Sequence, residues 1–154
     1  MNQFYTVIAL SVPAMVAPAA VEADAVDPVE IYLDCSAYVI NSLYTVIMDP
    51  ATLENPEAAA ERVRAITEDV RGRLAAVKGA DAEELRMAEV RMIEETEEGA
   101  RLEQMLDDVA WYVAEHEELE NCEVLMNAVI ELRSMMQRAG DGEDVSVDEH
   151  EEEY

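Results

Sequence analysis

Basic residues are scarce in this chain. It has 10 Lys and Arg against 36 Asp and Glu, which gives a formal net charge of −26 over 154 residues. A surface with that balance repels phosphate backbones, so direct binding of DNA or RNA is excluded. Nine of the ten basic residues are Arg and only Lys78 is Lys. An acidic surface of this kind resembles the bias of salt-loving microbes, and the alternative is an acidic protein of a GC-rich mesophile or its virus.

Large aromatic side chains are also few, since the chain has one Phe and one Trp. Leu, Val, Ile, Ala and nine Met must therefore fill any core, and several of these are strong helix formers. With 51% hydrophobic residues, the chain is long enough to bury a core as one domain. The composition predicts an all-α fold.

Cysteine is limited to Cys35 and Cys122. Two cysteines so far apart form no CxxC pair and exclude a structural zinc site. If the helices that carry them are neighbours, a disulfide between them would close a long loop and stabilise the fold by about 4 kcal/mol. The alternative is two free thiols that pack as small apolar side chains.

Motifs that carry chemistry are absent from the sequence. His116 and His150 follow Val113 and Val147 at three residues, so neither belongs to the Glu-x-x-His pair of a di-iron bundle. There is no phosphate-binding glycine loop, no HExxH and no GxSxG. With 36 acidic residues, the adjacency of two carboxylates indicates nothing about acid or base catalysis. We therefore expect no enzyme activity, no cofactor and no metal site.

The stretch of residues 27–50 organises the rest of the chain. Asp27 and Pro28 are typical of a helix start, and Asp49 followed by Pro50 is typical of a helix end. Nearly all sides of the helix between them, about 28–48, are apolar, which predicts a buried helix. Its length would also suit a membrane span, but Asp34 and Asn41 lie inside it and no Lys or Arg flanks it, so we expect no membrane span.

Three further helices follow in the prediction. They are expected at about 56–78, 81–118 and 121–138, because apolar residues recur there at steps of three and four. The apolar stripe is weakest across residues 94–99, where we expect a bend, a water-filled gap or an exposed turn of helix. Near 118–121 the stripe changes phase, which indicates a turn or a single long helix with a stutter. Residues 27–138 are thus predicted to form a three- or four-helix antiparallel bundle.

Residues 1–26 contain an apolar run interrupted by two prolines and are predicted to form an extended apolar arm. Such an arm must lie in a groove of a partner or of its own domain. A secretory signal is a third interpretation, although no Lys or Arg precedes the run. The candidate partner-binding residues of the arm are Phe4, Tyr5, Val7, Ile8 and Leu10.

Two other features concern the C-terminal end. Met135 and Met136, near the end of the predicted helices, are candidates for exposure to a partner, because methionine adapts its shape to a binding surface. Residues 139–154 are polar and acidic without an apolar stripe, which predicts a disordered acidic tail.

The leading hypothesis is a non-enzymatic structural protein that docks into a larger multi-subunit assembly, such as a virion or a shell-like particle. The arm and the helical faces would make the contacts, with copies of the chain or with other proteins as partners. The alternative is an acidic helical adaptor or chaperone for a basic or apolar protein client, including a mimic of nucleic acid. A virion or cytoplasmic location is favoured over secretion.

Overall fold

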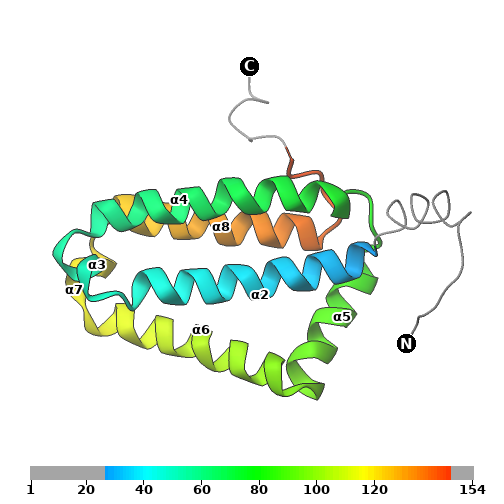
Figure 1. The fold of residues 1–154 in the computed structure, drawn as a ribbon, viewed down its shortest axis with the longest axis horizontal. Helices are drawn as coiled ribbons and strands as arrows, with labels where there is room; N and C mark the ends of the chain where they lie inside the picture. The colour runs from blue at the N-terminus through cyan, green and yellow to red at the C-terminus, as the bar shows by residue number, and fades with distance from the viewer. Residues whose placement is uncertain (1–26, 147–154) are drawn as a thin grey trace, which may run out of the picture.

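The structure is a computed structural model that describes residues 27–146. Within that range the chain forms seven α-helices and one 3-10 helix, and no strand (Figure 1). The all-α prediction is therefore confirmed for the described residues. The predicted arm, residues 1–26, and residues 147–154 of the predicted tail lie outside them.

Helix α2, Pro28–Ile47, lies at the centre (Figure 1). It packs against α4 (Pro56–Arg73), the 3-10 helix η2 (Leu74–Val77), α5 (Ala82–Glu95) and α6 (Glu97–Glu115). The Asp27 carboxylate caps it by accepting a hydrogen bond from the Val29 amide at 2.9 Å. Asp34 and Asn41, the polar residues that argued against a membrane span, need no partner from another helix. Asp34 is exposed, and the Asn41 side chain donates to the Ala37 carbonyl of the same helix at 2.8 Å.

Residues 27–146 contain no helix that is both long and apolar enough to cross a membrane.

The sequence Asp49-Pro50 ends α2 and also starts a short helix that the sequence did not predict. This helix, α3, spans Pro50–Glu54, and the Asp49 carboxylate accepts from the Ala51 amide at 3.0 Å. Helix α4, Pro56–Arg73, and the 3-10 helix η2, Leu74–Val77, follow where one helix was expected over 56–78. The Thr52 hydroxyl donates to the Val46 carbonyl, which fixes the corner between α2 and α3.

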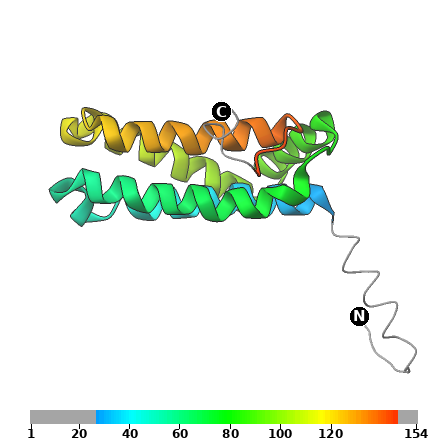
Figure 2. The same ribbon diagram turned by 90° about the horizontal axis from the view of Figure 1, so that it is seen from above.

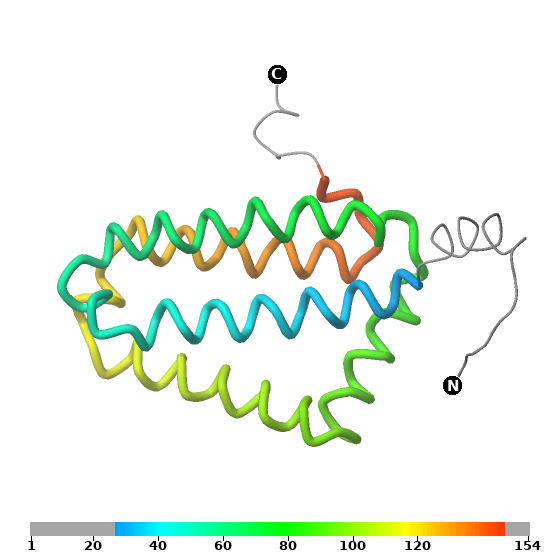
Figure 3. Tube along the Cα trace, viewed as in Figure 1, coloured from blue at the N-terminus to red at the C-terminus, as the bar shows by residue number. Residues whose placement is uncertain are grey.

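The single helix expected over 81–118 is wrong, because the chain breaks twice in that range. The segments are α5, Ala82–Glu95, α6, Glu97–Glu115, and the one-turn helix α7, Glu117–Glu120. The first break, at Thr96, lies inside the stretch where a bend was expected, and it makes a sharp corner in the Cα trace (Figure 3). The second break, at His116, precedes the expected turn by a few residues.

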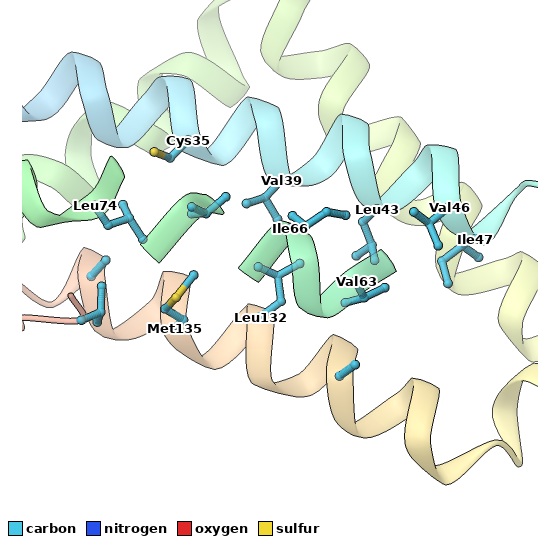
Figure 4. Packing of buried hydrophobic residues seen from close by; sticks show 14 of the residues in the cluster. Cys35, Val39, Leu43, Val46, Ile47, Val63, Ile66, Leu74, Leu132 and Met135 are labelled. Atoms are coloured by element: carbon cyan, nitrogen blue, oxygen red, sulfur yellow. The ribbon is translucent and has the colours of Figure 1, made fainter. Parts of the chain in front are cut away.

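Helix α8, Glu123–Gly140, completes the core by packing along α4 (Figure 2). Leu132 and Met135 of α8 meet Val63 and Ile66 of α4 and the inner side of α2 (Figure 4). The same core contains Val39, Leu43, Val46 and Ile47 of α2, together with Leu74. The core is thus built from aliphatic side chains and methionine, in keeping with the lack of Phe and Trp.

The cysteines are both free thiols, so the candidate disulfide between Cys35 and Cys122 is absent. Cys35 is buried in the core, and this burial raises the pKa of its thiol and keeps it protonated. Cys122 is half-buried at the start of α8.

The prediction of a disordered tail from residue 139 is wrong for residues 139–146. Helix α8 continues to Gly140, and the Gly79 amide donates to the Gly142 carbonyl at 3.2 Å. Val145 is only 1% exposed and belongs to the core. Asp144 lies 3.5 Å from the Lys78 ammonium. A single buried valine and a few polar contacts are enough to hold this segment on the body, although it has no helical periodicity.

Candidate functional site

A groove runs over the central helix, between α5 and α6 on one side and α8 on the other. Its apolar section is a cavity of about 210 Å³. The floor of this section comes from α2, and its walls carry Leu106 of α6 and Met136 of α8. The residues that line it are Ser36, Val39, Ile40, Leu43, Glu89, Leu106, Arg133 and Met136.

The groove continues toward the start of α2 as a polar section of about 620 Å³. The two sections share Glu89, Arg133 and Met136, so they form one continuous depression. The polar section is lined in addition by Tyr32, Arg86, Ile130, Ser134, Gln137, Gly140 and Asp141. We use "the groove" for these two sections together.

The groove exists because α6 and α8 pack on different neighbours. Helix α8 lies along α4, whereas α6 lies along α2 and is joined to the body at its two ends by α5 and α7. The side of α8 that faces the groove therefore has no helix closing over it, and Val129 and Met136 there are only half-buried.

Two large apolar side chains at the groove remain exposed to solvent. Leu106 on α6 is 43% exposed, and Ile130 on α8 is 60% exposed. A single exposed apolar residue needs no explanation on a protein surface. Here Leu106 lines the apolar section and Ile130 lines the polar section, on opposite walls of the same groove, which is typical of a surface that another segment covers.

The polar section holds both signs of charge. The Arg86 guanidinium binds the Asp141 carboxylate at 3.1 Å, and the Ser36 hydroxyl donates to Glu89 at 3.3 Å. Burial, and next the charge of Glu89, raises the pKa of Tyr32 to about 12, so the phenol stays neutral. Arg133 has no ion pair among the described residues.

Of the partner-binding residues predicted from the sequence, the structure describes Met135 and Met136, and these two lie on different sides of α8. Met135 is fully buried between α8 and α4, so its predicted exposure is wrong. The reason is helical phase, because Leu125, Leu132 and Met135 share the side of α8 that faces α4. Met136, one position on, is half-buried and lines the groove. The arm residues Phe4, Tyr5, Val7, Ile8 and Leu10 lie outside the described residues.

Sequence reasoning missed Leu106, Ile130 and Arg133 as groove residues. Leu106 recurs at helical spacing with Leu102 and Val109, which is the pattern expected of a core residue. Ile130 was the detectable signal, because it falls outside the apolar stripe formed by Leu125, Val129 and Leu132. An isoleucine on an otherwise polar side of a helix indicates an exposed contact surface.

A second surface lies on α6 and is defined by Asp107, Trp111 and Glu115, which we call the Trp111 face. Trp111 is 69% exposed, the largest exposure among the large apolar residues described. It follows the buried Leu102 by nine residues, about two and a half turns, so it points away from α2. Asp107 and Glu115 lie one turn before and after it and are exposed.

No group of three or more His, Cys, Asp and Glu side chains within residues 27–146 is arranged to hold a metal ion. His116, the histidine of the described part, places Nδ1 at 2.7 Å from the Tyr112 carbonyl, and its ring lies 4.2 Å from the Tyr112 ring. These contacts belong to the end of α6.

Comparison with protein-family models, with curated proteins and with solved structures found no match. The interpretation of the groove and of the Trp111 face therefore depends on their geometry and chemistry.

Proposed function

We propose that the chain is a non-enzymatic structural protein of a larger protein assembly, such as a virion or a shell-like particle, and that it docks through the groove and the N-terminal arm. The observation that supports this is the pair Leu106 and Ile130, exposed on opposite walls of the groove, Leu106 in its apolar section and Ile130 in its polar section. In this proposal α2, α4, α6 and α8 act as an antiparallel four-helix bundle that presents the groove.

Covering the groove would release a useful amount of free energy. Full burial of a Leu or Ile side chain contributes roughly 1.5–3 kcal/mol. With 43% and 60% of their surfaces still exposed, Leu106 and Ile130 would together contribute about 2 kcal/mol when a partner segment covers them. The half-buried Met136 between them adds an adaptable surface.

The test compares glutamate substitutions inside and outside the groove. Leu106→Glu with Ile130→Glu places two charges in the contact and should release subunits from the native particle. Val124→Glu is the matched control, since Val124 is 40% exposed, lies on the same helix α8, and lines neither section of the groove.

Particle mass would be measured by static light scattering, with circular dichroism to show that each variant remains helical. The groove variant should give a smaller particle and the control an unchanged one. An unchanged particle in both would contradict docking through the groove.

The Trp111 face supports a second candidate function, an acidic adaptor or chaperone for a basic protein client. Exposed Trp flanked by carboxylates suits a partner rich in Lys and Arg, because Trp residues often dominate binding and Arg stacks on aromatic rings. This role includes the nucleic-acid mimic considered from the sequence, in which carboxylates take the place of phosphates.

A basic peptide of mixed Lys and Arg is a direct probe of that role. Trp111 is the only Trp, so its fluorescence would report binding without a label. We expect binding that weakens steeply with salt and is lost in the double variant Asp107→Asn, Glu115→Gln. Binding that salt does not change would contradict electrostatic recognition by this face.

A further inference from the structure

We propose that in the separate chain the groove is occupied by the chain's own N-terminal arm, with residues 4–10 in the apolar section. This inference rests on the proposed function, in which the groove is a docking site, and it names the segment that docks there. The arm of a second copy is the competing occupant.

The described part of the chain begins at the polar end of the groove, which is the end from which the arm can enter it. Asp27 caps α2, and Tyr32, five residues later in the same helix, lines the polar section. The N-terminal end of α2 therefore lies beside the polar section, where α2 packs against α5 (Figure 1). An arm that turns back at Asp27 would lie antiparallel to α2. Traced from Asp27 toward Met1, it would pass first along the polar section and then along the apolar section.

The length of the chain suits this path. The floor of the apolar section spans residues 36–43, which lie nine to sixteen residues beyond Asp27, or about 14–24 Å along the helix axis. Sixteen residues, 11–26, separate Leu10 from Asp27. For a chain of sixteen residues, random-coil statistics give a root-mean-square span of about 20–24 Å. Because the span of the linker matches the distance to be covered, the effective concentration of residues 4–10 at the groove is near its maximum, on the order of millimolar.

The distribution of charge along the arm also fits the two sections. Residues 4–21 contain no charged side chain, which suits an apolar section formed by Val39, Ile40, Leu43, Leu106 and Met136. The acidic residues of the arm, Glu22 and Asp24, come just before Asp27 and would lie at the polar section. That section contains Arg86 and Arg133, and Arg133 has no ion pair within residues 27–146.

Repulsion between copies favours the same choice. Each chain has a formal net charge of −26, so a second copy must approach against a strong field when salt is low. A covalently attached arm meets no such barrier. Assembly would then be an exchange, in which the arm leaves its own groove and makes the same contacts in a neighbour, as in domain swapping.

The test uses the full chain with the photoreactive residue p-benzoylphenylalanine in place of Tyr5. On irradiation we expect cross-links to peptides of the groove, around residues 39–43 and Leu106, at the mass of a single chain. Their yield should not change on dilution from micromolar to nanomolar concentration. Leu106→Glu and Arg133→Glu should each lower the yield several-fold, whereas Val124→Glu should not.

The other outcomes separate this inference from the proposed function. Cross-links at the mass of two chains that decrease on dilution would overturn the inference and leave the groove as a docking site filled by a neighbour. Absence of cross-links to groove residues would also overturn it, and the particle masses of the Leu106 and Ile130 variants would then decide the docking function separately. An equal loss of yield in the Val124 control would show that the cross-link does not report on the groove, which also contradicts the inference.

Discussion

Replacing Gly99 by alanine should force α5 and α6 apart at their corner. Gly99 lies in the first turn of α6, just after Thr96, whose hydroxyl accepts from the Gly99 amide at 2.9 Å and donates to the Met92 carbonyl at 2.6 Å. A Cβ at Gly99 would lie 1.9 Å from the Met92 carbonyl oxygen and 2.6 Å from Ile93 Cα. These are backbone atoms, so no change of side-chain rotamer relieves the contact.

Two opposing effects set the size of the change. In a helix without steric conflict, Gly to Ala stabilises by about 1 kcal/mol. Overpacking that displaces backbone costs about 1–3 kcal/mol, occasionally more. Since the contact distances at Gly99 are far below van der Waals separation, we expect a cost at the upper end of that range, so that the free energy of unfolding falls by about 2 kcal/mol after the gain is subtracted.

Gly72 supplies the matched control. It is exposed on α4, and a Cβ there would meet no atom within 4 Å outside its own helix backbone. Gly72→Ala should therefore raise the free energy of unfolding by about 0.5–1 kcal/mol. The two variants are the same chemical change with opposite expected signs.

Urea unfolding followed by far-ultraviolet circular dichroism measures both. Thermal unfolding should agree, with a shift of about 2–4 °C per kcal/mol for a chain of this size. If Gly99→Ala stabilises the protein as Gly72→Ala does, the close approach of α6 to the end of α5 is refuted.

The remaining predictions concern pH, packing and salt. The pKa of Tyr32 is raised to about 12 from its ordinary 10.0, so the stability that the neutral phenol contributes is complete below pH 10 and is lost as the pH rises to 12. Tyr32→Phe should reduce this loss, which urea unfolding measured between about pH 9 and pH 12 would show. Leu132→Ala, at a fully buried position, should cost about 2–5 kcal/mol of unfolding free energy, whereas Ile130→Ala should change it by about 0.5 kcal/mol or less in the same assay. Reductant should leave the melting temperature unchanged, because Cys35 and Cys122 are free. If the acidic surface is an adaptation to high salt, helicity by circular dichroism should fall as salt is removed, and full helicity in low salt would contradict that interpretation.

Helix starts were the part of the fold best predicted from sequence. Asp27, Asn55 and Asp81, at or just before the expected helix starts, each accept a hydrogen bond from a backbone amide of the following turn. Such caps are local chemistry, so the order of residues is sufficient to identify them. The Asp49-Pro50 pair was nevertheless interpreted only as a stop, although the same two residues are equally suited to begin a helix.

The candidate site could not be predicted in the same way, because it depends on which helices pack together. Helix α8 has apolar residues on two sides, and its sequence alone does not say that Met135 faces α4 while Met136 faces the groove. Val145 shows the same limit, since a lone valine among acidic residues has no period to detect. The exact position of the break at Thr96 could not be predicted either, because a helix capped by threonine needs neither Gly nor Pro at its start.

The attachment of α6 to the body by α2 and its own two ends has a consequence for how the fold opens. Helix α6 buries only Gly99 and Leu102, whereas α4 buries seven residues and α8 six, so α6 loses less core packing on detaching. We expect the amide hydrogens of α6 to exchange with solvent deuterium together, and earlier than those of α4 and α8. Detachment of α6 would also remove one wall of the groove, so the least stable unit of the fold is the one that controls how wide the docking site opens.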